Sequence, residues 1–222
     1  MKTLLVILNP RNIRMAVESL EALPCDRVWL RGFTEKQVQH AAWPTMMRDA
    51  RKRKYGRMVV ISDDGRVPRG AWDAVMAVAD RGHPVTTGWC NLDLGRGWDI
   101  SNLVSGPLAA TAAETTQQEF YSAPDVFTYP SDEVPTSFHG HALLTMPWEV
   151  AERFPFECYQ EGVGWSSDYH HSRRLADAKV DIVAARDGFV VHLKEVWNHF
   201  DHAETKKLVH LTAATQEVVW EK

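Results

Sequence analysis

Cysteine is scarce in this chain and follows no binding pattern. The 222 residues include three cysteines, Cys25, Cys90 and Cys158, which are odd in number, widely separated and without a CxxC pair. We therefore expect neither a disulfide framework nor a zinc site made of thiolates. The scarcity favours a reducing, cytoplasmic setting, because disulfides persist mainly in oxidising compartments.

Long apolar runs and a surplus of positive charge are also missing. No stretch reaches the roughly 20 apolar residues that a transmembrane helix needs, so we expect no stable membrane insertion. The run from Met1 to Leu8 lacks a following cleavage-like site and predicts a strand, not a signal peptide. With a formal charge of −4, the chain does not imply a polyanionic partner, although a nucleic acid stays open as an acceptor.

The chain does have enough apolar material for one core. Apolar side chains make up 45% of the residues, and the length favours a single domain that spans residues 1–222. We find neither an internal repeat nor a low-complexity linker in the sequence. One continuous folding unit is therefore expected.

Strands and helices are predicted to alternate in the first part of the chain. Apolar runs of strand length lie at 3–8, 28–30 and 58–61, and residues 85–90 resemble a further strand. Helical spacing follows at 15–23 and 71–80, and Thr34 can cap a short helix that Pro44 should break, with turns at 45–54. This alternation predicts an α/β fold with a Rossmann-like, mainly parallel central sheet and helices on both faces. Ligands of such sheets bind at the carboxyl ends of the strands.

The second half of the chain is less regular. Residues 91–137 carry several glycines and prolines and predict an irregular excursion with short strands, of the kind that often shapes a ligand site. The remaining elements are expected as a strand at 138–146, a helix at 147–154, a helix at 168–178, strands at 180–184 and 189–193, and a terminal helix at 203–220.

Two adjacent carboxylates follow the third predicted strand. The apolar run at 58–61 stops at Ser62, Asp63, Asp64 and Gly65. Ionised carboxylates at the end of a buried strand are costly unless water, hydrogen bonds or a cation compensates them. Mg2+ and Mn2+ prefer oxygen ligands and commonly bridge carboxylates to phosphates. Because Asp-Asp-Gly is also ordinary turn chemistry, a plain surface turn is the alternative.

Two further polar residues stand at the ends of predicted elements. Asp168 begins a predicted helix, where it is either a reactive carboxylate or a simple cap favoured by the helix dipole. His192 ends an apolar run, where an imidazole either binds a metal or a substrate, or is structural. Three close histidine pairs lack a convincing third ligand for zinc: His139 with His141, His170 with His171, and His199 with His202.

Taken in order, these segments resemble the family 2 glycosyltransferases and their glycosyltransferase A-type fold. The strand that ends in Ser62, Asp63 and Asp64, with Pro68 shortly after, resembles the Asp-x-Asp motif of that family. The loop at 9–12 resembles the nucleotide-contacting loop after the first strand.

The resemblance continues through the second half of the chain. Residues 138–143 and 147–154 resemble the strand and helix that precede the acceptor loop. The segment 162–181 resembles the Glu-Asp motif and its helix, with Asp168 at the aspartate and serine at the glutamate. His192 resembles a strand-end histidine that often completes the metal site. Residues 28–33 depart from the family because they lack the acidic turn that usually meets uracil.

The resemblance implies a metal-dependent, inverting glycosyltransferase that moves a sugar from a nucleotide-sugar donor, expected to be a UDP-sugar, to a hydroxyl acceptor. Asp64, with Asp63 and His192, would bind Mn2+ or Mg2+ beside the diphosphate. Asp168 would act as the general base on the acceptor hydroxyl. The residues implied to contact the nucleotide sugar are Pro10, Arg11, Asn12, Ser62, Asp63 and Trp165.

The resemblance also divides the chain and leaves two alternatives. It implies a nucleotide-binding half at 1–92 and an acceptor-binding half at 93–222. The serines at the two acidic motifs favour one alternative, a domain that binds a nucleotide or glycan without turnover. The other alternative is a nucleotidyltransferase that uses the same acidic turn and releases pyrophosphate.

Overall fold

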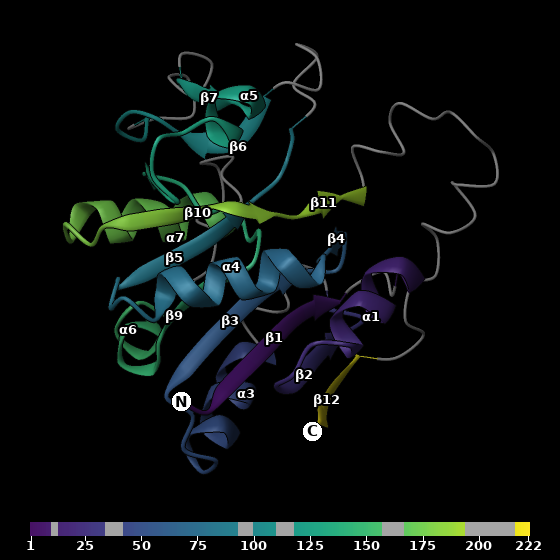
Figure 1. Cartoon of the computed structure of the whole chain (residues 1–222). Coiled ribbons are helices and arrows are strands. Elements are labelled where there is room, and N and C mark those ends of the chain that lie inside the picture. Colours follow the sequence, from purple (N-terminus) through teal and green to yellow (C-terminus); the bar gives the residue numbers. More distant parts are fainter. Residues whose placement is uncertain (10–12, 34–41, 93–99, 110–117, 157–166, 194–215) are drawn as a thin grey trace.

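One large mixed sheet organises the chain in the computed structural model, which describes residues 1–9, 13–33, 42–92, 100–109, 118–156, 167–193 and 216–222 (Figure 1). The strands of this sheet are β1 (Thr3–Asn9), β2 (Asp26–Arg31), β3 (Arg57–Ser62), β5 (Val85–Trp89), β8 (Glu133–Thr136), β9 (Leu144–Pro147), β10 (Ile182–Phe189) and β12 (Glu217–Glu221). Their spatial order is β12-β2-β1-β3-β9-β5-β10-β8.

The strand directions confirm the expected, mainly parallel sheet. β1 is parallel to both β2 and β3, and β10 is parallel to β5. β9 is antiparallel to both of its neighbours, β3 and β5, so β5 and β10 run in the same direction as β3. β8 and β12 are antiparallel additions at the two edges. The carboxyl ends of β1, β2, β3, β5 and β10 therefore lie along one edge, which we call the carboxyl edge.

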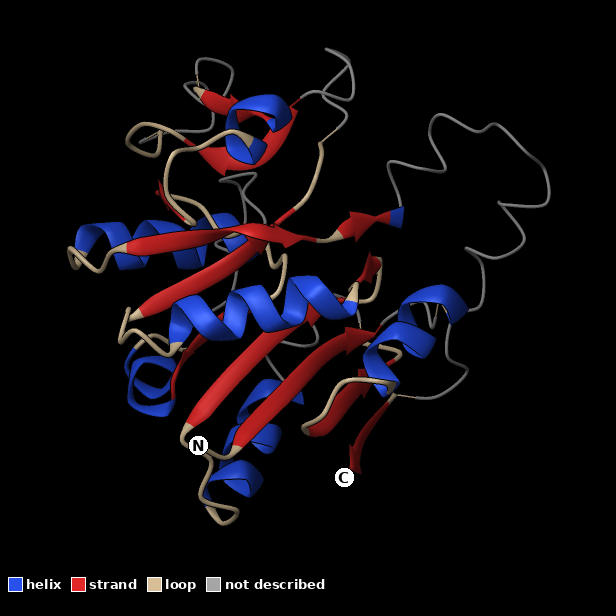
Figure 2. Ribbon diagram, viewed as in Figure 1, coloured by secondary structure: helices blue, strands red, loops and turns tan. Residues whose placement is uncertain are grey.

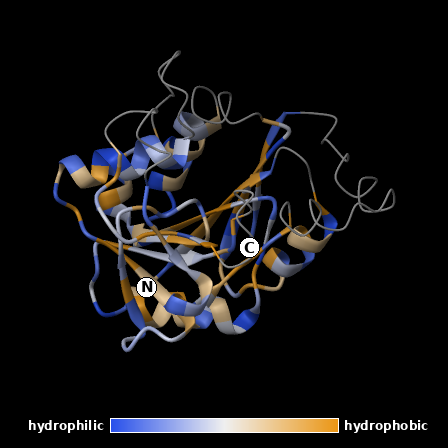
Figure 3. Cartoon of the chain, turned by 90° about the horizontal axis from the view of Figure 1, so that it is seen from above, coloured by the Kyte–Doolittle hydropathy of each residue, from blue (hydrophilic) through white to orange (hydrophobic). Residues whose placement is uncertain are grey.

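Helices cover both faces of the sheet, as Figure 2 shows. Leu5, Ile7 and their neighbours on one face pack against α1 (Arg14–Glu21) and α4 (Arg69–Ala79). Leu4, Val6 and their neighbours on the other face pack against α3 (Trp43–Arg51), α6 (Trp148–Arg153) and α7 (Ser167–Asp177). Burial on both faces explains the continuous apolar runs in β1 and β3, and orange strands lie inside the molecule in Figure 3.

Two smaller units complete the described part of the chain. β6 (Ile100–Val104) pairs with β7 (Phe120–Ser122), and α5 (Ala123–Phe127) follows directly. Trp89, at the end of β5, packs beneath this unit with Leu103 and Val126. β4 (Gly65–Arg66) pairs with β11 (Val191–His192) in a second short ribbon. In the described part of the chain, no helix is long and apolar enough to cross a membrane.

Three expectations from the sequence are wrong in the described residues. Residues 45–51, expected as turns, belong to the helix α3, and Pro44 stands in its first turn, where its missing N–H costs no hydrogen bond. Residues 217–221 form the edge strand β12, because β-branched and aromatic side chains favour a strand there. The expected strand at 138–146 begins only at Leu144, and β10 and β11 replace the expected strands at 180–184 and 189–193. Residues 34–41 and 203–215 lie outside the described part.

A strained segment at 139–143 takes the place of the first part of that strand. Gly140, His141 and Leu143 have φ angles of 55°, 50° and 64°, a left-handed conformation that costs about 1 kcal/mol or more for a residue with a side chain. The Thr87 hydroxyl lies 3.1 Å from the carbonyl oxygen of His139 and 3.3 Å from that of Ala142. The segment is thus pinned to the carboxyl end of β5.

A directional chain of hydrogen bonds joins this segment to α7. His171 Nε2 lies 2.9 Å from the carbonyl oxygen of Phe154, which can only accept, so His171 Nε2 carries the proton. His171 Nδ1 therefore accepts from His139 Nε2 at 2.9 Å. The N–H of His141 then donates to His139 Nδ1 at 3.3 Å. All three bonds are satisfied when both imidazoles are neutral, and we call them the histidine relay.

Burial keeps both rings of the relay neutral. Removal from water lowers the pKa of His171 to about 3, although the hydrogen bond to Phe154 opposes this change. Burial also lowers the pKa of His139 well below its usual value, with further lowering from the neighbouring His171 and His141. The two histidines are therefore structural hydrogen-bonding groups at neutral pH, not charges.

We predict that Gly88→Ala lowers the free energy of unfolding by about 1–3 kcal/mol, because overpacking forces the backbone apart. A Cβ atom at Gly88 would lie 2.6 Å from the Gly188 carbonyl oxygen and 2.7 Å from that of Ala142. Gly70→Ala is the matched control, since a Cβ atom there meets nothing within 4 Å and the residue is helical. Urea unfolding measures both variants, and equal stability would contradict the described packing at Gly88.

We predict that stability falls as the pH falls from about 6.5 to 5. In this window the histidines of the unfolded chain take up protons, while His139 and His171 in the folded chain do not. Each of the two histidines adds to the slope of the free energy of unfolding against pH. This contribution approaches about 1.4 kcal/mol per pH unit below pH 6.5 and vanishes above it. Urea unfolding at several pH values should give a smaller slope for His171→Gln than for the wild type. Carboxylates with a lowered pKa, such as Glu133 beside Arg81, change the pH dependence of stability only below this pH window.

Candidate functional site

The acidic turn lies at the carboxyl end of the central strand β3. Ser62 ends this strand, and Asp63 and Asp64 follow with only 1% and 6% of their surfaces exposed. Both carboxylates are thus inside the protein, which does not fit a plain surface turn. Buried carboxylates need compensating partners.

Asp64 has partners from two distant parts of the chain. The Ser62 hydroxyl donates to Asp64 Oδ1 at 2.6 Å, and His192 Nε2 lies 3.3 Å from Asp64 Oδ2. The backbone supports this arrangement: His192 is paired with Gly65 in the β4–β11 ribbon, and the Leu193 N–H donates to the Asp64 carbonyl oxygen at 2.8 Å. The structure therefore brings together two of the predicted site residues, 128 positions apart in the sequence.

The pair formed by Asp64 and His192 fits a divalent cation. Two ligands that each bind a cation at about 2.1 Å lie about 3.0–3.4 Å apart at right or tetrahedral angles. The 3.3 Å between Asp64 Oδ2 and His192 Nε2 falls in that range and also suits a direct hydrogen bond. Among the residues that the structure describes, no group of three or more His, Cys, Asp or Glu side chains could hold an ion. Waters and phosphate oxygens would have to complete the coordination, as is usual for Mg2+.

Asp63 stands beside this pair but is not shown to join it. Its carboxylate is almost fully buried and has interactions of its own within the protein. A role for Asp63 as a metal ligand or as a nucleotide contact stays a prediction.

Asp168 is the second residue of α7 and is half-buried. Its Oδ1 accepts a hydrogen bond from the N–H of Tyr169 at 2.8 Å. α7 ends at Asp177 and β10 begins at Ile182, so the helix runs back along the sheet and its first turn lies toward the carboxyl edge (Figure 1). Ser172 confirms this placement, because its hydroxyl accepts from the His139 N–H beside the end of β5.

Asp64 and Asp168 therefore both lie toward the carboxyl edge of the sheet. Asp64 follows the central strand β3, whereas α7, which carries Asp168, is bonded to the segment beside the end of β5.

Several predicted residues lie outside the described part of the chain. Pro10, Arg11 and Asn12 are among them, and so is Trp165. Asn9, the last residue of β1, is fully buried at the carboxyl edge, and its carbonyl oxygen accepts from the Gly32 N–H at 3.0 Å.

The sequence reasoning missed the contact between His139 and His171. It paired each histidine with its neighbour in the sequence, whereas the structure joins one member of each pair. Helical periodicity carried the signal: His171 lies four residues after Ser167 and four before Leu175, all on the buried face of α7. A histidine at such a position needs a buried hydrogen-bond partner.

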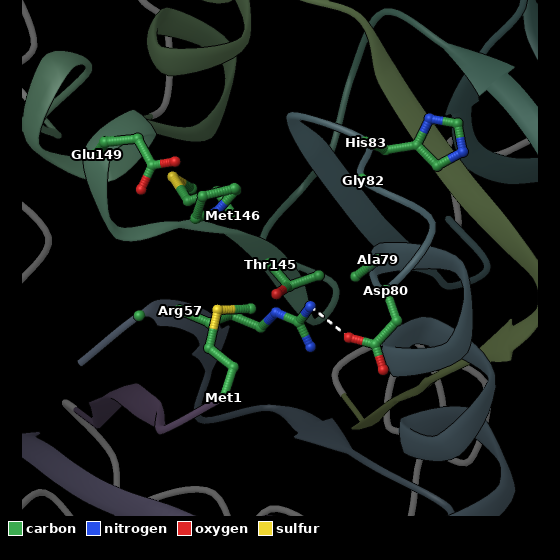
Figure 4. A pocket seen from close by; sticks show the side chains of 11 residues that line it. Met1, Arg57, Ala79, Asp80, Gly82, His83, Thr145, Met146 and Glu149 are labelled. Carbon is green, nitrogen blue, oxygen red and sulfur yellow. Dashed lines mark hydrogen bonds and ion pairs between the residues drawn. The ribbon is translucent and has the colours of Figure 1, made fainter.

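The hollow drawn in Figure 4 lies away from these residues. It has a volume of about 410 Å³ and is lined by residues that include Arg57, Asp80, Thr145 and Met1. Arg57, at the amino end of β3, pairs with Asp80 at 2.6 Å. The hollow thus opens at the opposite edge of the sheet, and none of the predicted site residues lines it.

Comparison with known proteins establishes the fold. No protein-family model and no curated protein sequence matches the chain. The crystal structure of A197 from STIV superposes with a TM-score of 0.50 at 13% identity, covering 83% of this chain and 81% of that chain. The structure of GalNAc-T7 with UDP, GalNAc and Mn2+ gives a TM-score of 0.52 at 8% identity and covers 86% of this chain.

This chain spans only 43% of the GalNAc-T7 chain. At such low identities the likeness concerns the fold alone. It confirms the expected fold class, a mixed α/β architecture similar to glycosyltransferase A-type structures, and leaves the narrower resemblance to family 2 as a prediction.

Proposed function

We propose that the chain is a metal-dependent, inverting glycosyltransferase that uses a nucleotide-sugar donor. The observation that carries this proposal is the contact between Asp64 and His192 at the carboxyl end of β3, in a sheet of the glycosyltransferase A type. GalNAc-T7, which has a similar fold, was crystallised with UDP, GalNAc and Mn2+. These ligands support UDP as the first nucleotide to test and Mn2+ or Mg2+ as the cation.

Asp64 and His192 would hold the cation at the donor diphosphate. When bound, a divalent cation supplies positive charge that stabilises the leaving diphosphate. The Ser62 hydroxyl occupies Oδ1 of Asp64, so Oδ2 is the oxygen that faces His192. Serine at this position therefore orients the carboxylate without adding a further negative charge.

Asp168 would act as the general base on the acceptor. As the acceptor oxygen bonds to the anomeric carbon, the bond from that carbon to the diphosphate breaks and Asp168 takes the hydroxyl proton. Attack from the face opposite the leaving group inverts the anomeric configuration and needs no covalent intermediate. The N–H of Tyr169 donates to Oδ1 of Asp168 and so helps to orient this carboxylate.

The proposal does not specify the chemical class of the hydroxyl acceptor. Proteins, small molecules, lipid-linked saccharides and nucleic-acid bases all present suitable nucleophiles. A division into a nucleotide-binding half at 1–92 and an acceptor-binding half at 93–222 is part of this proposal.

We predict that Asp64→Asn abolishes the Mn2+-dependent stabilisation of the protein by UDP. Removal of the carboxylate charge removes a cation ligand, whereas a ligand that binds only the folded chain raises its melting temperature by mass action. A thermal-shift experiment with UDP, GDP and CDP, with and without Mn2+, measures this effect. Asp49→Asn is the matched control, since Asp49 is a partly exposed acid on α3. Equal Mn2+-dependent shifts in both variants would refute the metal site.

We predict that Asp168→Asn lowers the kcat for nucleoside diphosphate release about 10²–10⁴-fold while the donor KM stays similar. Release from a panel of nucleotide sugars with Mn2+ measures the reaction, with water as the acceptor. Donor binding by the wild type without any release would favour a non-catalytic binding domain. Pyrophosphate release from a nucleoside triphosphate would instead indicate a nucleotidyltransferase.

A further inference from the structure

The first two turns of α7 are held by three separate segments. The carbonyl oxygen of Phe154 receives the hydrogen bond from His171, and the Arg174 Nη1 donates to the Pro155 carbonyl oxygen at 2.7 Å. On another side, the Tyr169 hydroxyl donates to the Ala109 carbonyl oxygen at 2.7 Å. The third segment is the strained one at 139–143, which contacts α7 through the histidine relay.

The relay meets α7 within one turn of Asp168. His171 follows Asp168 by three residues, a spacing that places the two side chains on neighbouring positions of one helix surface. Ser172, the next residue, accepts from the His139 N–H at 3.4 Å. His139 thus contacts two successive residues of α7, which fixes both the position of the helix and its rotation about its axis.

Aromatic rings pack closely around the relay. The ring of Phe156 stacks on His171 with centroids 4.1 Å apart, and the ring of Phe138 stacks on His139 at 6.1 Å. Leucine side chains would fill such a space without any need for buried polar partners. What the imidazoles add is direction, because each hydrogen bond is satisfied in only one relative orientation of the rings.

Backbone strain at the far end of the relay points to function. Left-handed residues concentrate at sites where the surroundings hold a strained geometry in place for a purpose. Here the strained segment holds His139, and His139 holds α7.

We propose that His139 and His171 are positioning residues that fix the Asp168 carboxylate at the carboxyl edge. This inference rests on the proposed function, because it takes Asp168 as the general base. Neither histidine exchanges a proton with substrate. Their effect on the reaction passes through the first turn of α7.

A pair of variants at His139 tests this role. His139→Gln keeps an N–H group that can donate to His171 Nδ1, whereas His139→Leu leaves that nitrogen buried without a donor. We expect His139→Leu to lower the kcat for nucleoside diphosphate release about 10–100-fold with a similar donor KM, since small misplacement of a catalytic group has effects of this size. His139→Gln should restore most of the lost kcat. Val78→Ala, a buried change on α4, is the control for loss of stability alone.

Amide hydrogen exchange tests the same role without any turnover. The N–H of Tyr169 is bonded to Asp168 Oδ1, so its exchange rate reports the position of that carboxylate. We expect this amide to exchange faster in His139→Leu, near the wild-type rate in His139→Gln, and unchanged in Val78→Ala. Equal exchange in the three variants and the wild type, or equal kcat in the two His139 variants, would overturn the positioning role.

The two measurements separate this inference from the proposed function. If the wild type releases no nucleoside diphosphate from any donor, the proposed function fails and the exchange of the Tyr169 amide alone decides whether the relay positions Asp168. If the wild type is active and the two His139 variants behave alike, the function stands and the relay is only structural.

Discussion

The pairing of β4 with β11 is the interaction on which the candidate site depends. It sets His192 opposite Gly65 and thereby brings an imidazole to within 3.3 Å of Asp64. Each strand of this ribbon is only two residues long, so the two hydrogen-bonded pairs could not hold it alone. Its flanks supply the missing stability: Val67 and Val190 belong to the core cluster that also contains Ile61. The site is therefore fixed by hydrophobic packing on either side of a short polar contact.

The sequence was most informative where burial on both faces left only one interpretation. The apolar runs of β1 and β3 are what a covered parallel strand requires, and the end of the β3 run located the acidic turn. The sequence was least informative where the same residues are compatible with two local structures. Pro44 ends one helix or opens another, and the run at 217–221 becomes a strand only because β2 offers an unpaired edge. Such choices depend on tertiary neighbours that no short window of sequence contains.

The candidate site could be predicted in part for the same reason. Asp64 follows β3 and His192 lies on β11, just after β10; β3 and β10 run in the same direction, so their ends lie at one edge and the approach of the two residues agrees with the topology. The histidine relay does not follow from strand ends, because His139 stands in a segment whose left-handed residues interrupt the expected strand. Gly88, which allows the Ala142 carbonyl oxygen to approach β5, is the one local sign of that irregularity. Gly88, a glycine inside the buried strand β5, was thus the feature to consider together with the histidines.

The two ends of the sheet carry different kinds of buried charge, which favours the carboxyl edge as the working one. At the opposite edge, where β3 begins, the buried guanidinium of Arg57 forms an ion pair with Asp80. At the carboxyl edge Asp63 and Asp64 are both buried, and both have interactions within the protein; those of Asp64 include the Ser62 hydroxyl and His192. The first turn of α7 presents a third carboxylate, that of Asp168, toward the same edge. Carboxylates thus gather at the edge where a sheet of this kind binds its ligands.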